Sequence, residues 1–138
     1  MTGPDAVSEA LLAGEVPPGA YRWGPGTAHV GALVAGAADA GWAVARLDGA
    51  RVRTVDDLHD ALAVSLALPA HYGRNLDALH DCVADLPTPG LLVWDGWGGF
   101  AREHPRTTRL ALQVLGERLV VLVTGPGPDD EVPLPGLG

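Results

Sequence analysis

The stretch HYGRNLDALHDC, from His71 to Cys82, decides the fold, because it combines a glycine turn, a helix cap and a patterned helix. Asn75, the only asparagine of the chain, stands where a helix N-cap is needed, and apolar residues then recur at helical spacing at positions 76, 79 and 83. The opposite face carries Asp77, His80, Asp81 and Asp85. Carboxylates one turn apart repel by roughly 0.2 to 0.5 kcal/mol per pair. Folding alone does not require this arrangement, so it indicates a function.

Short apolar runs alternate with helical patterns on both sides of this helix. We predict strands over residues 20–23, 42–47, 91–94 and 119–124. We predict helices over residues 5–13, 27–40 and 105–118, and one that begins near Thr54, where Thr54 and Asp57 have capping-box spacing, and stops at Pro69. This alternation is typical of an α/β fold, a parallel sheet covered by helices with right-handed crossovers.

The segment LDGARVRTVDDLHDALAVSLALPAHYGRNLDALHDCVADL, from Leu47 to Leu86, resembles the barstar family, intracellular protein inhibitors of the secreted ribonuclease barnase. The run LQVLGE, Leu112 to Glu117, resembles the family's last helix. The resemblance covers roughly residues 43–124 and implies a small three-stranded parallel sheet. Residues 1–42 are expected to form an extension packed on the same domain (short helix, strand, helix) that adds a fourth strand. Residues 125–138, rich in Pro, Gly and Asp, are expected to be a flexible tail.

The resemblance also implies a set of binding residues. Asp77 and Asp81 match the family's two aspartates on the acidic helix, Tyr72 matches the second residue of its tyrosine pair, and Glu117 matches an acid that reaches the nuclease from the last helix. His71 and His80 stand where the family has a tyrosine and a tryptophan, which leaves room for a target other than barnase. The predicted partner-binding set is Asp77, Asp81, Tyr72, His80, His71, Glu117 and Arg74. Asp81 is expected to be its central anchor.

Such a surface suits inhibition without chemistry. Carboxylates on a rigid helix can imitate RNA phosphates and pair with the cationic side chains of a ribonuclease cleft. We therefore expect a non-enzymatic protein without cofactor or metal, which forms a one-to-one complex burying about 800 Å² per partner. The alternative is an immunity or interaction module of the same fold directed against another nuclease or toxin.

Charge and composition favour a protein partner. The 138 residues carry 17 acidic and 9 basic side chains, a net charge of -8, and every basic residue is arginine. Nucleic acid and anionic lipid both need a positive surface, so neither is expected to bind directly, whereas a basic ribonuclease fits. The single cysteine, Cys82, cannot form an internal disulfide, and no secretory signal or membrane span is recognisable. We expect a cytoplasmic protein that is monomeric when free.

The sequence also allows two other interpretations. Trp23 to Asp48 looks superficially like a dinucleotide fingerprint, with Gly24 and Gly26 between a strand and a helix, although His29 stands at the third glycine position. The histidines and aspartates near the acidic helix could gather a metal, although no metal-ligand spacing supports this.

Single residues also have ordinary structural explanations. Asp77 could simply support the helix terminus, and His80 and Glu117 could be solvated surface groups. Tyr72 is expected to pack its ring beside Gly73 and leave its hydroxyl outside, and Trp97 is expected to be the most exposed tryptophan.

Overall fold

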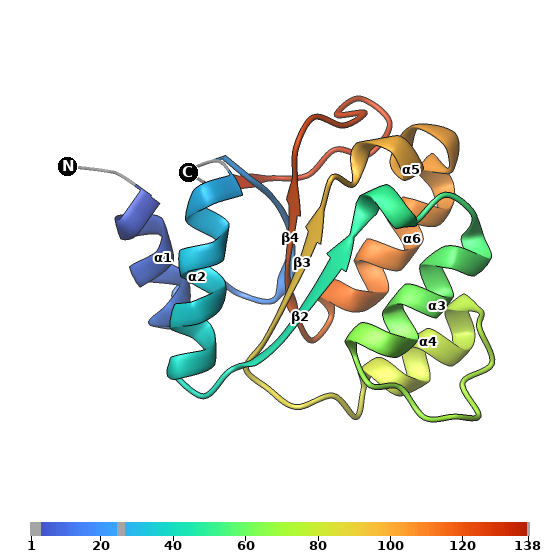
Figure 1. The fold of residues 1–138 in the computed structure, drawn as a ribbon, viewed down its shortest axis with the longest axis horizontal. Helices are drawn as coiled ribbons and strands as arrows, with labels where there is room; N and C mark the ends of the chain where they lie inside the picture. The colour runs from blue at the N-terminus through green and yellow to red at the C-terminus, as the bar shows by residue number, and fades with distance from the viewer. Residues whose placement is uncertain (1–3, 25–26, 138) are drawn as a thin grey trace.

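The fold is built on a parallel sheet of five strands in the order β2-β3-β4-β1-β5, seen in the computed structural model of the chain (Figure 1). The structure describes residues 4–24 and 27–137. The strands are β1 (Gly19–Trp23), β2 (Ala43–Asp48), β3 (Gly90–Asp95), β4 (Val120–Thr124) and β5 (Gly136–Leu137). The helices are α1 (Pro4–Leu12), α2 (Thr27–Asp39), α3 (Val55–Ser65), α4 (Leu76–Val83), α5 (Gly98–Glu103) and α6 (Pro105–Gly116), with a 3-10 turn, η1, at Gly49–Arg51.

Helices cover both faces of this sheet, as the alternation of elements predicts. Figure 1 shows α1 and α2 on one side and α3, α4, α5 and α6 on the other. The inner strand β3 is buried from Gly90 to Trp94 and divides its side chains between two cores: Leu91 and Val93 pack with α1 and α2, while Leu92 and Trp94 pack with the other helices. An almost unbroken apolar run is what a strand covered on both faces requires. The α/β class and the barstar-like parallel sheet are confirmed.

The N-terminal extension supplies the second layer. Leu11 of α1 and Val30, Leu33 and Ala37 of α2 are buried against β3 and β4, and β1 pairs with β4 as the fourth strand. The extension therefore packs on one face of the sheet of the barstar-like part, and α3 to α6 cover the opposite face.

The C-terminal segment differs from the flexible tail that its composition suggests. Gly136 and Leu137 pair with Arg22 and Trp23 of β1, which adds a fifth strand to the four expected. Val132 is only 1% exposed and belongs to the core. Val132 and Leu134 pack in the core beneath α3 to α6 and Leu137 packs in the other core, so scattered apolar residues hold this segment against the protein.

Trp97 was expected to be exposed among its glycines but is fully buried. Its indole Nε1 donates to the carbonyl of Gly125 at 3.2 Å. A Cβ at Gly127 would lie 2.4 Å from the Trp97 ring, so glycine is required where the C-terminal segment crosses the indole. The surrounding glycines therefore allow close packing of the backbone on the ring rather than exposure.

The capping box of α3 is confirmed. The hydroxyl of Thr54 accepts a hydrogen bond from the Asp57 amide at 3.0 Å, and the Asp57 carboxylate accepts from the Thr54 amide at 3.1 Å. These two bonds satisfy donors at the helix terminus that would otherwise lack partners. They fix the start of α3, the helix on which the loop before α4 rests.

Candidate functional site

The acidic helix α4 starts where the sequence predicts. Asn75 is extended, with φ -145° and ψ 170°, and its side-chain oxygen accepts from the Ala78 amide at 2.8 Å. Leu79 and Val83 are buried in the core, so the opposite side of the helix faces solvent. Arg74, just before the cap, has φ 56°, a left-handed conformation that reverses the chain into the helix.

Carboxylates of two helices meet on this exposed side. We define the acidic surface as Asp77, His80 and Asp81 of α4 together with Glu117, which directly follows α6. Nε2 of His80 lies 3.2 Å from Oε2 of Glu117, and its Nδ1 lies 3.8 Å from Oδ1 of Asp81. All four side chains are exposed, and 87% of the Asp81 side chain is open to solvent. The structure thus joins Glu117 to α4 through His80, although Glu117 and His80 lie 37 positions apart in the sequence.

The other predicted binding residues are spread around this surface. His71 is exposed in the loop before α4. Arg74 turns toward α3, where its Nη2 lies 2.7 Å from Oδ1 of Asp60. Asp85, which belongs to the acidic pattern but not to the predicted binding set, is exposed in the turn after the helix, where its amide donates to the Cys82 carbonyl at 3.2 Å. The Cys82 thiol is free and half-buried.

Tyr72 does not leave its hydroxyl outside, contrary to the expectation from sequence. The residue is 8% exposed, and its Oη lies 2.6 Å from Nδ1 of His59, a buried residue of α3. Burial raises the pKa of Tyr72 to about 12, so the hydroxyl stays protonated and can donate to the ring nitrogen. The hydroxyl is thereby occupied inside the protein, and Tyr72 can affect a partner mainly through the shape of the loop it anchors.

His59 and Asp60, which the sequence analysis did not single out, hold this loop to α3. His59 contacts Tyr72 and Asp60 pairs with Arg74, so two adjacent residues of α3 fix two points of the chain just before α4. Burial lowers the pKa of His59 below its ordinary value of 6.5, so the ring is neutral. A signal was present in the sequence: His59 stands three positions before Leu62, on the same side of the helix as the apolar stripe.

The dinucleotide interpretation is not supported by the strand order. That fingerprint needs its two strands side by side, but β1 and β2 are separated by β3 and β4, roughly 14 Å at ordinary strand spacing. Asp48, the acid at the end of β2, accepts from the Ala50 amide at 3.0 Å and so caps η1. Of the loop glycines, Gly26 lies outside the described residues.

A cluster of internal polar contacts lies at the carboxyl edge of the inner strands, where open α/β sheets usually bind ligands. Arg46 Nε lies 2.5 Å from Oδ2 of Asp95, and the Thr124 hydroxyl donates to Oδ1 of the same carboxylate at 3.2 Å. The hydrogen bond to Asp95 raises the pKa of Arg46. This cluster therefore ties β2, β3 and β4 together.

Neither a metal-binding cluster nor a membrane span is found over residues 4–24 and 27–137. No group of three or more His, Cys, Asp or Glu side chains there is arranged so that it could hold a metal ion. His80 lies near Asp81 and Glu117, but these three side chains do not form such a group. None of the helices in that part of the chain is long and apolar enough to span a bilayer.

Comparison with known proteins links the sequence to one family. The sequence model of the family "Barstar (barnase inhibitor)" matches residues 42–120, more than half of the chain. A stretch of 44 residues is 48% identical to a protein of Bacillus subtilis (strain 168) named "Putative ribonuclease inhibitor YrdF". That stretch is 30% of this chain and 48% of the relative, so the chain matches about half the length of this curated protein.

Solved structures share the architecture at low sequence identity. A chain in "Structure of Drosophila ORC bound to AT-rich DNA and Cdc6" aligns over 91% of this chain and 49% of its own length, with a TM-score of 0.56 and 16% identity. A chain in "Structure of Drosophila ORC bound to DNA" aligns over 88% and 79%, with a TM-score of 0.55 and 15% identity. At these identities the likeness concerns the fold alone, and it covers more of the chain than the family model does.

Proposed function

The chain is a member of the barstar family, and from that premise we propose that it inhibits a ribonuclease by covering the enzyme's active site with the acidic surface. The observation that carries this proposal is that the exposed carboxylates of Asp81 on α4 and of Glu117 after α6 both lie close to His80. Carboxylates held outward by packed helices can take the positions of RNA phosphates among the Arg, Lys and His side chains of a nuclease cleft. In this proposal the protein acts by occupancy and catalyses nothing.

The rigidity of the acidic surface supports the same proposal. Leu79 and Val83 anchor α4 in the core, Asn75 caps it, and α3 holds the preceding loop at Tyr72 and Arg74. A preorganised surface loses little conformational entropy when it binds, so more of its interaction energy appears as affinity. The repulsion between the carboxylates is a cost that packing offsets in the free protein and that a cationic partner would relieve.

The cellular setting is part of the proposal. A cytoplasmic monomer that binds one nuclease per chain would protect its own cell from the enzyme, and the single thiol of Cys82 suits a reducing compartment. The exposed His71 and His80 favour a ribonuclease other than barnase, because imidazoles replace the aromatic contact area that the family uses at these positions.

An RNA-cleavage assay tests this function. Cleavage would be followed with barnase as one probe and with the secreted ribonuclease fraction of the producing cell as the other, each with increasing amounts of the protein. We expect inhibition at near-stoichiometric protein for at least one enzyme, and relief of that inhibition by excess RNA. If neither enzyme is inhibited at any ratio, the proposed function is wrong.

Matched charge variants test the surface itself. The double variant Asp77→Asn, Asp81→Asn removes two charges from α4, and we expect a loss of inhibition of roughly a hundredfold or more, since each position should contribute on the scale of an interface hot spot. Asp39→Asn is the control, because Asp39 is exposed at the end of α2, on the other face of the sheet (Figure 1). Equal inhibition by the double variant and the wild type would show that another surface binds.

A further inference from the structure

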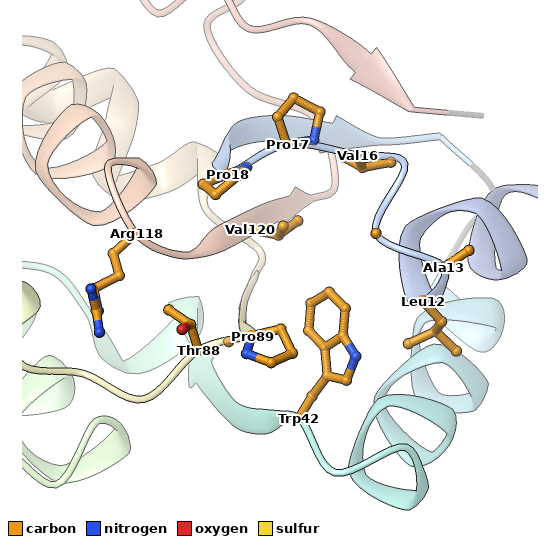
Figure 2. A pocket seen from close by; sticks show the side chains of 12 residues that line it. Leu12, Ala13, Val16, Pro17, Pro18, Trp42, Thr88, Pro89, Arg118 and Val120 are labelled. Atoms are coloured by element: carbon orange, nitrogen blue, oxygen red, sulfur yellow. The ribbon is translucent and has the colours of Figure 1, made fainter.

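A cavity of about 440 Å³ opens at the amino end of β3 and β4, between the N-terminal extension and the barstar-like part (Figure 2). Its walls include Leu12, Val16 and the Pro17–Pro18 turn from the extension, and Pro89 and Val120 from the other part. This volume lies within the usual range of sites for small organic ligands. The extension therefore does more than cover the sheet, because it encloses a hollow that neither part of the chain forms alone.

Trp42 provides the aromatic surface of this cavity. Figure 2 shows its indole rising between Pro89 and Leu12 toward Val16 and Pro17. Trp42 is only half-buried, whereas the other three tryptophans of the chain are buried. A large apolar ring held partly open in a hollow is a surface on which an apolar ligand can remove further area from water.

Arg118 adds a positive charge at one end of the cavity. The residue is half-buried, and its Nε donates to the Leu86 carbonyl at 2.5 Å. That bond uses one guanidinium nitrogen, and within the described part of the chain no carboxylate lies within ion-pair distance of the other two. Figure 2 shows the guanidinium on the same side as Thr88, across the cavity from Leu12 and Ala13. In a protein with a net charge of -8, a partly buried arginine without an acidic partner is a site suited to an external anion.

We propose that this cavity binds a small amphipathic monocarboxylate. Its apolar body would lie on Trp42, Pro89 and Val120, and its carboxylate would accept hydrogen bonds from the free Arg118 nitrogens. An apolar wall with one fixed charge at its end matches a ligand with one charged end, and it disfavours both neutral and cationic analogues. The inference does not rest on ribonuclease inhibition, because none of the acidic-surface side chains lines the cavity.

Titration with octanoate tests the proposal on the full-length protein. Tryptophan fluorescence would report binding near Trp42, and Trp42→Phe would assign the signal to that ring. Isothermal titration calorimetry would give the dissociation constant, with octanol and octylammonium as neutral and cationic probes of equal chain length. We expect saturable octanoate binding that is roughly tenfold or more tighter than binding of either analogue, as one charge-assisted hydrogen bond would give.

Two variants separate the charged end of the site from its apolar body. Arg118→Gln should weaken octanoate binding roughly tenfold or more and leave octanol binding unchanged, whereas Ala13→Phe, which fills the cavity from an exposed position, should abolish both. Arg106→Gln, at an exposed arginine of α6 that does not line the cavity, is the matched control and should change neither. Thermal unfolding of each variant would verify that it is folded. Non-saturable octanoate binding, octanol binding as tight as octanoate binding, or wild-type affinity in Ala13→Phe would each overturn the proposal.

Discussion

Asp81 is the side chain on which the proposed inhibition depends most. It lies beside His80 on the acidic surface, with 87% of its side chain open to solvent. We predict that Asp81→Ala weakens the complex with the target ribonuclease by more than about 2 kcal/mol, which is roughly a thirtyfold rise in Kd. This is the usual threshold for an interface hot spot, and the barnase–barstar complex is one of the examples from which that threshold is known. Calorimetry at one ionic strength would measure this, with Asp39→Ala as the control. A loss below about 1 kcal/mol would remove Asp81 from the centre of the interface.

His59 makes folding stability depend on pH. Burial lowers its pKa below 6.5, the positive charge of Arg74 lowers it further, and Asp56 and Asp60 act in the opposite direction. The unfolded chain therefore takes up a proton at a pH where the folded chain resists it. The stability that the neutral ring contributes is complete above about pH 6.5 and is lost as the pH falls through the folded-state pKa.

Urea unfolding between about pH 7.5 and about pH 5 would check this prediction. We expect the free energy of unfolding of the wild type to decrease over that range, and the decrease to be smaller in His59→Gln, which cannot titrate. Hydrogen bonds from the Thr54 and Arg53 amides lower the pKa of Asp57 from 3.8. The stability that the Asp57 carboxylate contributes is therefore lost only in more acidic solution, outside the pH range of this experiment. An unchanged pH slope in His59→Gln would show that another group is responsible.

At the level of elements, the start of α4 is set by one side chain. The Asn75 oxygen accepts from the Ala78 amide at 2.8 Å, and this bond aligns the turn that carries Asp77. We predict that Asn75→Ala lowers the free energy of unfolding by about 1 kcal/mol, the usual value of an N-cap, and that Asn75→Asp retains most of it. Chemical denaturation of the three proteins would measure the difference. Equal losses in both variants would mean that the amide nitrogen, which donates to the Gly73 carbonyl at 3.2 Å, matters more.

Elements that carry a strong local signal could be predicted from the sequence. The cap and apolar spacing of α4, the capping box of α3 and the apolar runs of β3 and β4 all encode structure within a few neighbouring residues. For the same reason, the exposed positions of Asp77 and Asp81 follow from helical periodicity alone.

Features that depend on contacts distant in the sequence could not be predicted in this way. β5 consists of two residues that pair with β1 more than a hundred positions earlier, so no local pattern marks it as a strand. The contact between His59 and Tyr72 depends on how the loop after α3 turns back, which spacing does not determine. Burial of Trp97 likewise depends on Gly127 from a distant segment.

At the scale of the whole molecule, the C-terminal segment is part of the core. Val132 is 1% exposed, whereas Val64 on α3 is 83% exposed, so the same substitution can be compared at a buried and an exposed site. We predict that Val132→Ala lowers the free energy of unfolding by about 1 to 3 kcal/mol and that Val64→Ala changes it by less than about 0.5 kcal/mol. Denaturant unfolding would measure both. A negligible effect at Val132 would show that residues after β4 do not contribute to the folding unit.

The net charge of the whole molecule should also control how fast a complex forms. With 17 acidic against 9 basic side chains, the protein attracts a basic ribonuclease at long range, and salt screens this attraction as the Debye length falls from about 10 Å at 0.1 M to about 3 Å at 1 M. We predict that the association rate constant, measured by stopped-flow fluorescence, falls on the order of tenfold or more over this range, while the dissociation rate constant changes much less. The double variant Asp77→Asn, Asp81→Asn should respond less to salt than Asp39→Asn, because the charges nearest the contact interact most strongly with the partner. An association rate that is independent of salt would mean that electrostatic attraction does not guide the encounter.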